Sequence, residues 1–171
     1  MGALVLAKVG HQRQLVSATE RSSSETFRLT ASFKDGWKEA VNIFRQNYGK
    51  VDGRIVRALP VTFKATGYFV ALDVYTVTIP ERMDTVTASS WAYRMDQNSA
   101  SAGFFALMAY GIQHFRQLGQ YERIVALGDH IREAGHCPSE VPVIIGHRQE
   151  VRLERFSKVW PAGTTFLRRR V

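Results

Sequence analysis

Cysteine is nearly absent from the sequence, and long apolar runs do not occur. The single cysteine among 171 residues, Cys137, excludes a disulfide within the chain. No run reaches the roughly 18 apolar residues of a transmembrane helix, so no membrane partner is expected. The opening MGALVLAKVG has no basic residue ahead of its apolar run, and Leu6 stands where a myristoylation signal needs Ser or Thr. These absences favour the cytoplasm, or a particle assembled inside a cell, over classical secretion.

Acidic residues are also few. Fifteen Asp and Glu face 23 Lys and Arg, which gives a formal net charge of +8 and a pI near 10.0. Such a surface attracts nucleic acid, anionic lipid or an acidic protein. The excess is concentrated at the end of the chain, because residues 150–171 hold six basic and two acidic residues, a net +4. The apolar fraction of 45% is typical of a folded globular protein.

Catalytic and metal-binding motifs are missing as well. Neither a Cys-x-x-Cys nor a His-Glu-x-x-His pattern occurs, although His130, His136, Cys137 and His147 lie within eighteen residues. Their spacing fits no zinc pattern, so we expect no metal site and no cofactor. Cys137 shows no sign of an oxyanion hole, and Asp73 has no visible second carboxylate for acid–base work. The sequence therefore favours a binding or structural protein over an enzyme.

Hydrophobic periodicity predicts one α+β domain over residues 1–171, with a mainly antiparallel sheet packed against about three helices. Strands are predicted over residues 3–9, 27–33, 53–64, 67–80, 84–95 and 141–146. Helices are predicted over residues 37–48, 101–115 and 121–134, with Gly49, Gly119 and Gly135 as their stops. The hydroxyls and rings of residues 84–95 either line an RNA-binding sheet or simply reflect the strand preference of these residue types.

The basic closing stretch, residues 150–171, is predicted to form a β-hairpin. Its WPAG sequence can turn the chain, so residues 150–159 and 164–171 become the two arms. Guanidinium groups pair with phosphates and aromatic rings stack on unpaired bases, which makes this hairpin the predicted nucleic-acid site. The predicted site residues are Arg152, Arg155, Lys158, Trp160, Arg168, Arg169 and Arg170.

A half-buried hairpin would explain the same composition, with its aromatic rings inside and its arginine stems lying over the sheet. Alternation along the strand favours a mixture of both interpretations. It sends Arg169 to the face opposite Arg168 and Arg170, so one face would hold a buried arginine that needs a partner.

Residues 116–121 suggest an alternative function. Arg116, Gly119 and the helix expected after them resemble the pyrophosphate-binding loop of GNAT acetyltransferases, which runs strand, Arg-x-x-Gly-x-Gly/Ala, helix. The resemblance implies a small acyltransferase that uses this loop to bind an acyl-coenzyme. Tyr121 departs from the pattern, because it occupies the small-residue position. The competing interpretation is that Gly119 ends one helix before the next begins.

Together these features predict a non-enzymatic, self-associating protein that binds a polyanion, with RNA favoured, such as a viral coat or nucleoprotein component. The order of strands followed by two helices is broadly similar to that of small RNA-phage coat proteins, apart from the extra closing hairpin. Self-association is expected through the apolar helix at Ser101–Phe115, whose Phe104, Phe105, Met108 and Ile112 can pack against a second subunit as readily as in the chain's own core.

Overall fold

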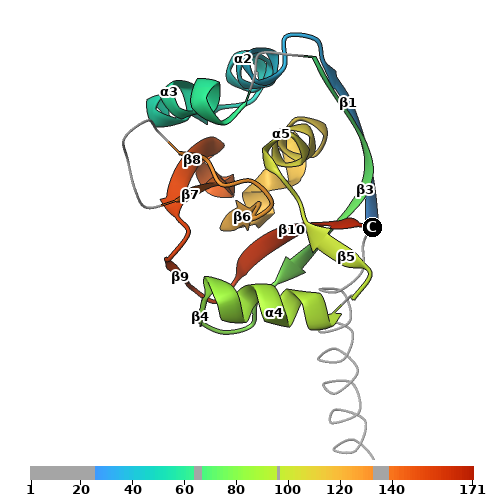
Figure 1. Ribbon diagram of the computed structural model, residues 1–171, viewed down its shortest axis with the longest axis vertical. Helices are drawn as coiled ribbons and strands as arrows, with labels where there is room; N and C mark the ends of the chain where they lie inside the picture. The colour runs from blue at the N-terminus through green and yellow to red at the C-terminus, as the bar shows by residue number, and fades with distance from the viewer. Residues whose placement is uncertain (1–25, 64–66, 96, 133–138) are drawn as a thin grey trace, which may run out of the picture.

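The structure, a computed structural model, describes residues 26–63, 67–95, 97–132 and 139–171 (Figure 1). Its strands are β1 (Thr26–Phe33), β2 (Lys50–Val51), β3 (Tyr68–Thr78), β4 (Met83–Asp84), β5 (Ser99–Ser101), β6 (Arg123–Val125), β7 (Glu140–Ile145), β8 (Glu150–Arg155), β9 (Val159–Trp160) and β10 (Thr164–Arg170). Its helices are α2 (Trp37–Asn47), α3 (Gly53–Thr62), α4 (Thr85–Met95) and α5 (Phe104–Gln113), with two 3₁₀ helices, η1 (Phe115–Gln120) and η2 (Gly146–Arg148).

The strands form a curled sheet in the order β1-β3-β10-β6-β7-β8-β2, and β5 joins it along β10. Most neighbouring strands are antiparallel, but β6 runs parallel to β10 and β2 runs parallel to β8. β4 and β9 pair separately. The predicted α+β class is confirmed, with a sheet that is mixed rather than purely antiparallel.

Helix α5 lies at the centre of the core, inside the curl of the sheet, and α2 and α3 cover it from the open side (Figure 1). Its residues 104–111 are all buried, as expected for a helix that is apolar on every side. Phe104, Phe105 and Met108 are 0%, 5% and 0% exposed, so they pack within their own chain. The prediction that this helix offers a surface to a second subunit is therefore wrong.

The elements with a clear hydrophobic period were predicted correctly. β1 buries Leu29 and Phe33 on alternate positions, and α2 buries Trp37 and Phe44 at helical spacing. β3 lies between β1 and β10, which explains its apolar residues on both faces. The residues 3–9 predicted as a strand lie outside the described residues.

Helix α3 replaces the strand predicted over residues 53–64. The Asp52 side chain accepts the N–H of Arg54 at 2.8 Å and so caps the first turn. Ile55 and Leu59 then face the core at helical spacing. Pro60 lacks an N–H and costs one helical hydrogen bond, but it lies in the last turn, where the helix tolerates it.

Helix α4 replaces the strand predicted over residues 84–95. Asp84 caps it, because its carboxylate accepts both the N–H and the hydroxyl of Thr87 at 2.9 Å. Ala88 and Ala92 are buried on its inner face. The helix itself lies on the side of the fold farthest from α2 and α3 (Figure 1). The predicted RNA-binding sheet face on these residues does not exist.

The helix predicted over residues 121–134 is also absent. Residues 123–125 instead form β6, which inserts between β10 and β7 with Ile124 and Val125 fully buried. The rest of this segment within the described residues is irregular, apart from a bridge between Ile131 and Glu140. Both partner strands of β6 come later in the chain, so the local pattern could not reveal them.

Candidate nucleic-acid interface

The closing stretch does not form a hairpin, which corrects the prediction for residues 150–171. Its first arm, β8, pairs with β7, whereas its second arm, β10, pairs with β3, β5 and β6. β6 and β7 lie between the two arms in the sheet. At about 4.8 Å per strand, β8 and β10 are roughly 14 Å apart. The predicted site residues therefore fall into two separate groups.

The first group surrounds the carboxylate of Glu154. Arg152 Nη2 lies 2.5 Å from Glu154 Oε1, and Lys158 Nζ donates a hydrogen bond to Glu154 Oε2. Burial alone would raise the pKa of Glu154, but the hydrogen bond from Lys158 and the charges of Arg152 and Lys158 outweigh it, so this pKa lies below its usual value. Arg152 and Lys158 thus share one carboxylate, which offsets one of their two positive charges.

Arg155, the third cation of this group, is exposed beside a shallow cavity of about 460 Å³. The same cavity is lined by Arg54 together with Glu140 and Glu154. Arg54 is itself paired, with its Nη1 3.0 Å from Glu140 Oε1 and its Nε 3.2 Å from Asp52 Oδ2. Because charges of both signs alternate here, this face is poorly matched to a polyanion.

Trp160 is a core residue rather than a stacking platform. Its ring is fully buried and packs edge-on against Phe166, with 5.9 Å between ring centroids. Its Nε1–H donates to Thr85 Oγ1 at 2.8 Å, and the Thr85 hydroxyl donates to the carbonyl of Phe156. Trp160 therefore holds α4 against the sheet and cannot stack on a base in this structure.

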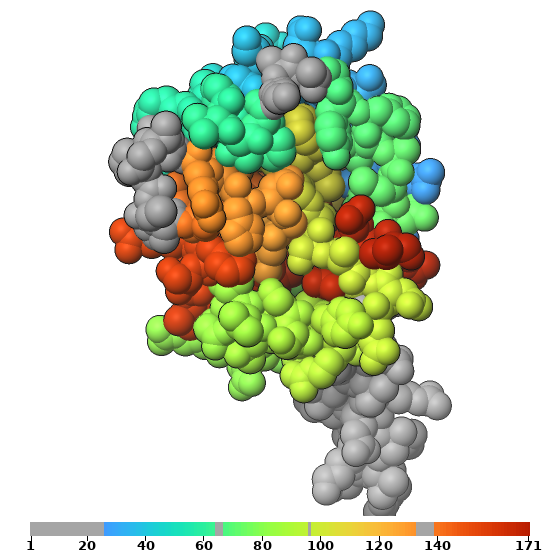
Figure 2. Space-filling model, in the orientation of Figure 1, coloured from blue at the N-terminus to red at the C-terminus, as the bar shows by residue number. Residues whose placement is uncertain are grey.

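The second group is the arginine run at the end of β10. Arg168 is only 4% exposed, so it is the buried arginine that the alternation predicted for one face. Its Nε and Nη2 donate to Ser99 Oγ at 3.1 and 3.0 Å, its Nη2 also reaches the Ser99 carbonyl at 3.1 Å, and its Nη1 lies 3.4 Å from Ser101 Oγ. Arg168 is therefore a structural residue and not a phosphate ligand. Arg169 and Arg170 are exposed and pair with β5 through their backbone. Figure 2 shows the end of the chain, in dark red, at the surface.

A cavity of about 190 Å³ lies beside Arg169, where β10 ends. β10 is shorter than β3, so the first half of β3 has β1 as its only partner among the described strands. Tyr68 lines the cavity, and its ring stacks on Phe105 with 4.0 Å between centroids. Asp129 also lines it, but its Oδ2 accepts the N–H of Phe104 at 2.6 Å, where the positive end of α5 offsets its charge. The cavity is thus lined by both a cation, Arg169, and an aromatic ring, Tyr68.

The geometry of residues 116–121 does not match the acyltransferase loop. A pyrophosphate loop follows a strand and opens a helix, whereas these residues follow α5, lie mainly in η1 and lead into β6. A Cβ placed on Gly119 meets nothing within 4 Å, so no backbone approaches it closely. Gly119 lies within η1 and does not open an α-helix, as the motif requires.

The remaining candidates from the sequence are the histidine and cysteine group and Asp73. Within the described residues, no three His, Cys, Asp or Glu side chains come together as a metal site, and His136 and Cys137 lie outside those residues. The ring of His130 packs against Phe156 at 4.4 Å between centroids. Asp73 is half-exposed and pairs with Arg28, whose Nη1 lies 3.0 Å from its Oδ1.

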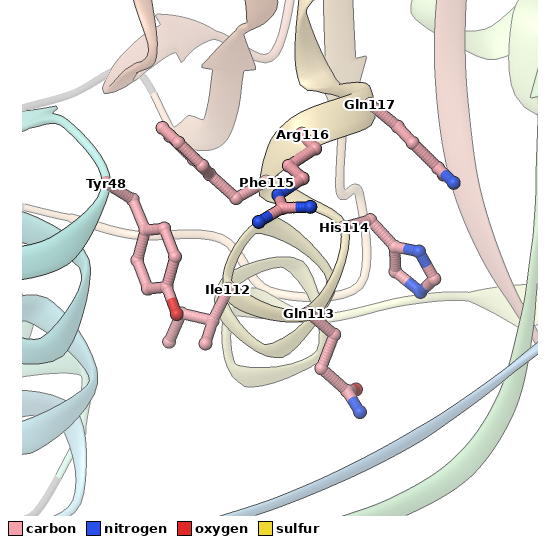
Figure 3. A pocket seen from close by; sticks show the side chains of 7 residues that line it. All are labelled: Tyr48, Ile112, Gln113, His114, Phe115, Arg116 and Gln117. Atoms are coloured by element: carbon pink, nitrogen blue, oxygen red, sulfur yellow. The ribbon is translucent and has the colours of Figure 1, made fainter.

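A third cavity, of about 420 Å³, was not predicted from the sequence. It lies where the end of α2 meets the junction of α5 and η1 (Figure 3). Its lining residues are Tyr48, Ile112, Gln113, His114, Phe115, Arg116 and Gln117. The sequence run QHFRQ, which brings rings, a cation and amides together, was the available signal, but Tyr48 comes from a distant part of the chain.

No protein-family model, curated protein or solved structure matches this chain. In the part of the chain that the structure describes, no helix is long and apolar enough to cross a membrane. Cavities at the end of β10 and at the end of α5 are each lined by an exposed arginine and aromatic side chains. The outer face of α4 also exposes an arginine beside a ring, with Arg94 and Tyr93.

Proposed function

We propose that this protein is a non-enzymatic, self-associating structural protein that binds a polyanion, with RNA favoured, in the cytoplasm or in a particle assembled there. The observation that carries the proposal is the exposed pair Arg169 and Arg170, which forms no ion pair with another described residue. Exposed guanidinium groups bind phosphates in a bidentate manner. The net charge of +8 adds a long-range attraction to any polyanion.

The end of β10 is an ordered support for these two side chains. Its backbone pairs with β3 on one side and β5 on the other, and Arg168 is bonded to Ser99 of β5. Because successive residues of a strand face opposite sides, Arg169 and Arg170 offer guanidinium groups on both faces of the sheet end. Side chains on such a support lose less conformational freedom on binding than side chains on a loop.

Self-association is supported by the outer face of α4 rather than by α5. Val86 and Tyr93 are 69% and 51% exposed, and they lie on one face of the helix with Ser90 between them. A shallow cavity of about 590 Å³ is lined by this face. Exposed apolar side chains grouped in this way mark interaction surfaces, and a second copy of the chain is the partner that we propose.

The test of polyanion binding is the salt dependence of RNA affinity in the variant Arg169→Gln/Arg170→Gln. Each phosphate contact adds about 0.7 to 0.9 to the slope of log affinity against log salt. The double variant is expected to bind RNA of any sequence more weakly, with a slope lower by roughly 1.4 to 1.8.

The matched control is Lys34→Gln/Lys50→Gln, which removes the same charge from two exposed positions away from the end of β10. The control is expected to keep most of the affinity, since it leaves the arginine pair intact. Unchanged affinity and slope in the arginine variant, or equal losses in both variants, contradict the assignment of the site to Arg169 and Arg170.

A further inference from the structure

The cavity at the end of α5 has an aromatic wall made from two parts of the chain. Tyr48 follows the last residue of α2, and Phe115 is the first residue of η1. Their ring centroids lie 4.8 Å apart at an interplanar angle of 53°. Both rings are half-buried against the main hydrophobic core, so they are held in place while they line the cavity. Figure 3 shows Tyr48 approaching from α2 toward the residues at the end of α5.

The polar groups of this cavity are suited to a ligand that carries both an anion and a flat ring. Arg116 is exposed and forms no ion pair with a described residue. Gln113 uses its Oε1 to accept the N–H of Thr30 at 3.2 Å, which fixes the amide and leaves its NH₂ group as a donor. Gln117 adds a second exposed amide. Figure 3 shows the Gln113 and Gln117 side chains pointing away from the helix axis.

Resting on the RNA binding proposed above, we propose that this cavity holds one unpaired nucleotide of a single-stranded RNA. The base lies against the rings of Tyr48 and Phe115, and its carbonyl oxygen accepts a hydrogen bond from Gln113. The neighbouring phosphate pairs with Arg116. Stacking on fixed rings together with one cation is the usual physical basis for binding single strands.

The dimensions of the cavity favour a single flipped-out base over a duplex. A volume of about 420 Å³ lies in the range of small-molecule sites, and a base that is paired and stacked inside a duplex cannot enter it. The cavity beside Arg169 is lined by Phe105, near the start of α5, whereas this cavity lies at the other end of the helix. The ten residues of α5 between them span about 15 Å along the helix axis.

The experiment compares the affinity of a short oligouridylate with that of an RNA duplex of the same length. Phe115→Leu keeps an apolar side chain but removes the ring, so it is expected to weaken oligouridylate binding by about 5- to 150-fold and to leave duplex binding unchanged. Arg116→Gln is expected to lower the salt slope for the single strand by about 0.7. The matched control is Phe69→Leu, which removes a ring that is 65% exposed on β3, outside the cavity.

The outcomes separate this inference from the proposed function. Wild-type protein that binds neither RNA refutes the proposed function, and the nucleotide site with it. Wild-type protein that binds RNA while Phe115→Leu and Phe69→Leu behave alike refutes the nucleotide site only. If Phe115→Leu does not fold, 4-thiouridine crosslinking of wild-type protein decides: crosslinks to Tyr48 or Phe115 support the site, and crosslinks confined to other segments overturn it.

Discussion

Arg168 lies buried against Ser99, and three of its hydrogen bonds go to that single residue. No carboxylate among the described residues pairs with its guanidinium group. The charge is instead distributed over two hydroxyls and a carbonyl of β5. Three consecutive arginines thus have two different roles, because the first fixes the strand end from which the other two project.

Arg168→Met is expected to lower the free energy of unfolding by about 1 to 3 kcal/mol, since the buried oxygens of Ser99 lose the donors they bond. Arg169→Met and Arg170→Met change exposed side chains and are expected to stay within ~0.5 kcal/mol of wild type. Urea unfolding of the three single variants measures the difference. Equal stability of all three would falsify the structural role of Arg168.

Thr85→Val removes the hydroxyl that bonds both Trp160 and the carbonyl of Phe156, and is expected to destabilise the fold by about 1 to 3 kcal/mol. Thr164→Val is the matched control, because the Thr164 hydroxyl is buried and has no hydrogen-bond partner among the described residues. It is expected to be neutral or stabilising, since Val has no polar group to desolvate. Thermal unfolding of both variants gives the comparison, and a larger loss in Thr164→Val contradicts this account.

The unfolding free energy is expected to fall in acid partly through Glu154. The pKa of Glu154 lies below its usual value in the folded state, so the unfolded chain binds this proton more tightly. The stabilisation from ionised Glu154 is complete above the unfolded pKa, near 4.5, and is lost as the pH falls through the lower folded pKa. The unfolding free energy of Glu154→Gln should be lower than that of wild type at neutral pH, and it should decrease less as the pH falls. Urea titrations across this pH range test it, and identical pH profiles for the two proteins count against the ion pairs.

Light scattering over a concentration series is expected to show self-association of the wild-type chain and its loss in Val86→Gln/Tyr93→Gln. These substitutions replace exposed apolar contacts on the outer face of α4 without touching the core. Met95→Gln is the matched control, because Met95 is exposed on the same helix but on a different face. Wild-type protein that remains monomeric at every concentration contradicts the proposal.

The sequence pattern alone was sufficient to predict a strand or helix whose apolar residues recur at a regular spacing along one buried face. This holds for β1, α2, β3 and α5. The two segments mistaken for strands are rich in Val and Thr, whose strand preference outweighed a capping signal that is present in the sequence. Asp52 and Asp84 each precede a helix and bond a backbone N–H of its first turn. Reading these two caps would have identified α3 and α4.

For the candidate binding residues, only those properties that depend on neighbours in the sequence could be predicted. Alternation anticipated one buried arginine, but not which one or that Ser99 would be its partner, because that pairing joins β5 to β10 across 69 residues. The turn at Pro161 does form, with the N–H of Thr164 bonded to the Pro161 carbonyl. The predicted hairpin does not form because β9 pairs with β4, and β10 pairs with more distant strands. No local signal in the sequence specifies these pairings.

The position of β10 has a consequence for how the chain is made. Among the described strands, β10 alone connects the β1–β3 pair to β6, β7, β8 and β2, and it is the last of them to be synthesised. At ribosomal rates of about 5 to 20 residues per second, the edges of the earlier strands that pair with β10 stay unpaired until β10 has been synthesised. Long-range pairing of this kind slows folding and leaves strand edges exposed to neighbouring nascent chains. Early termination before residue 164 would therefore favour aggregation during translation over a smaller folded product.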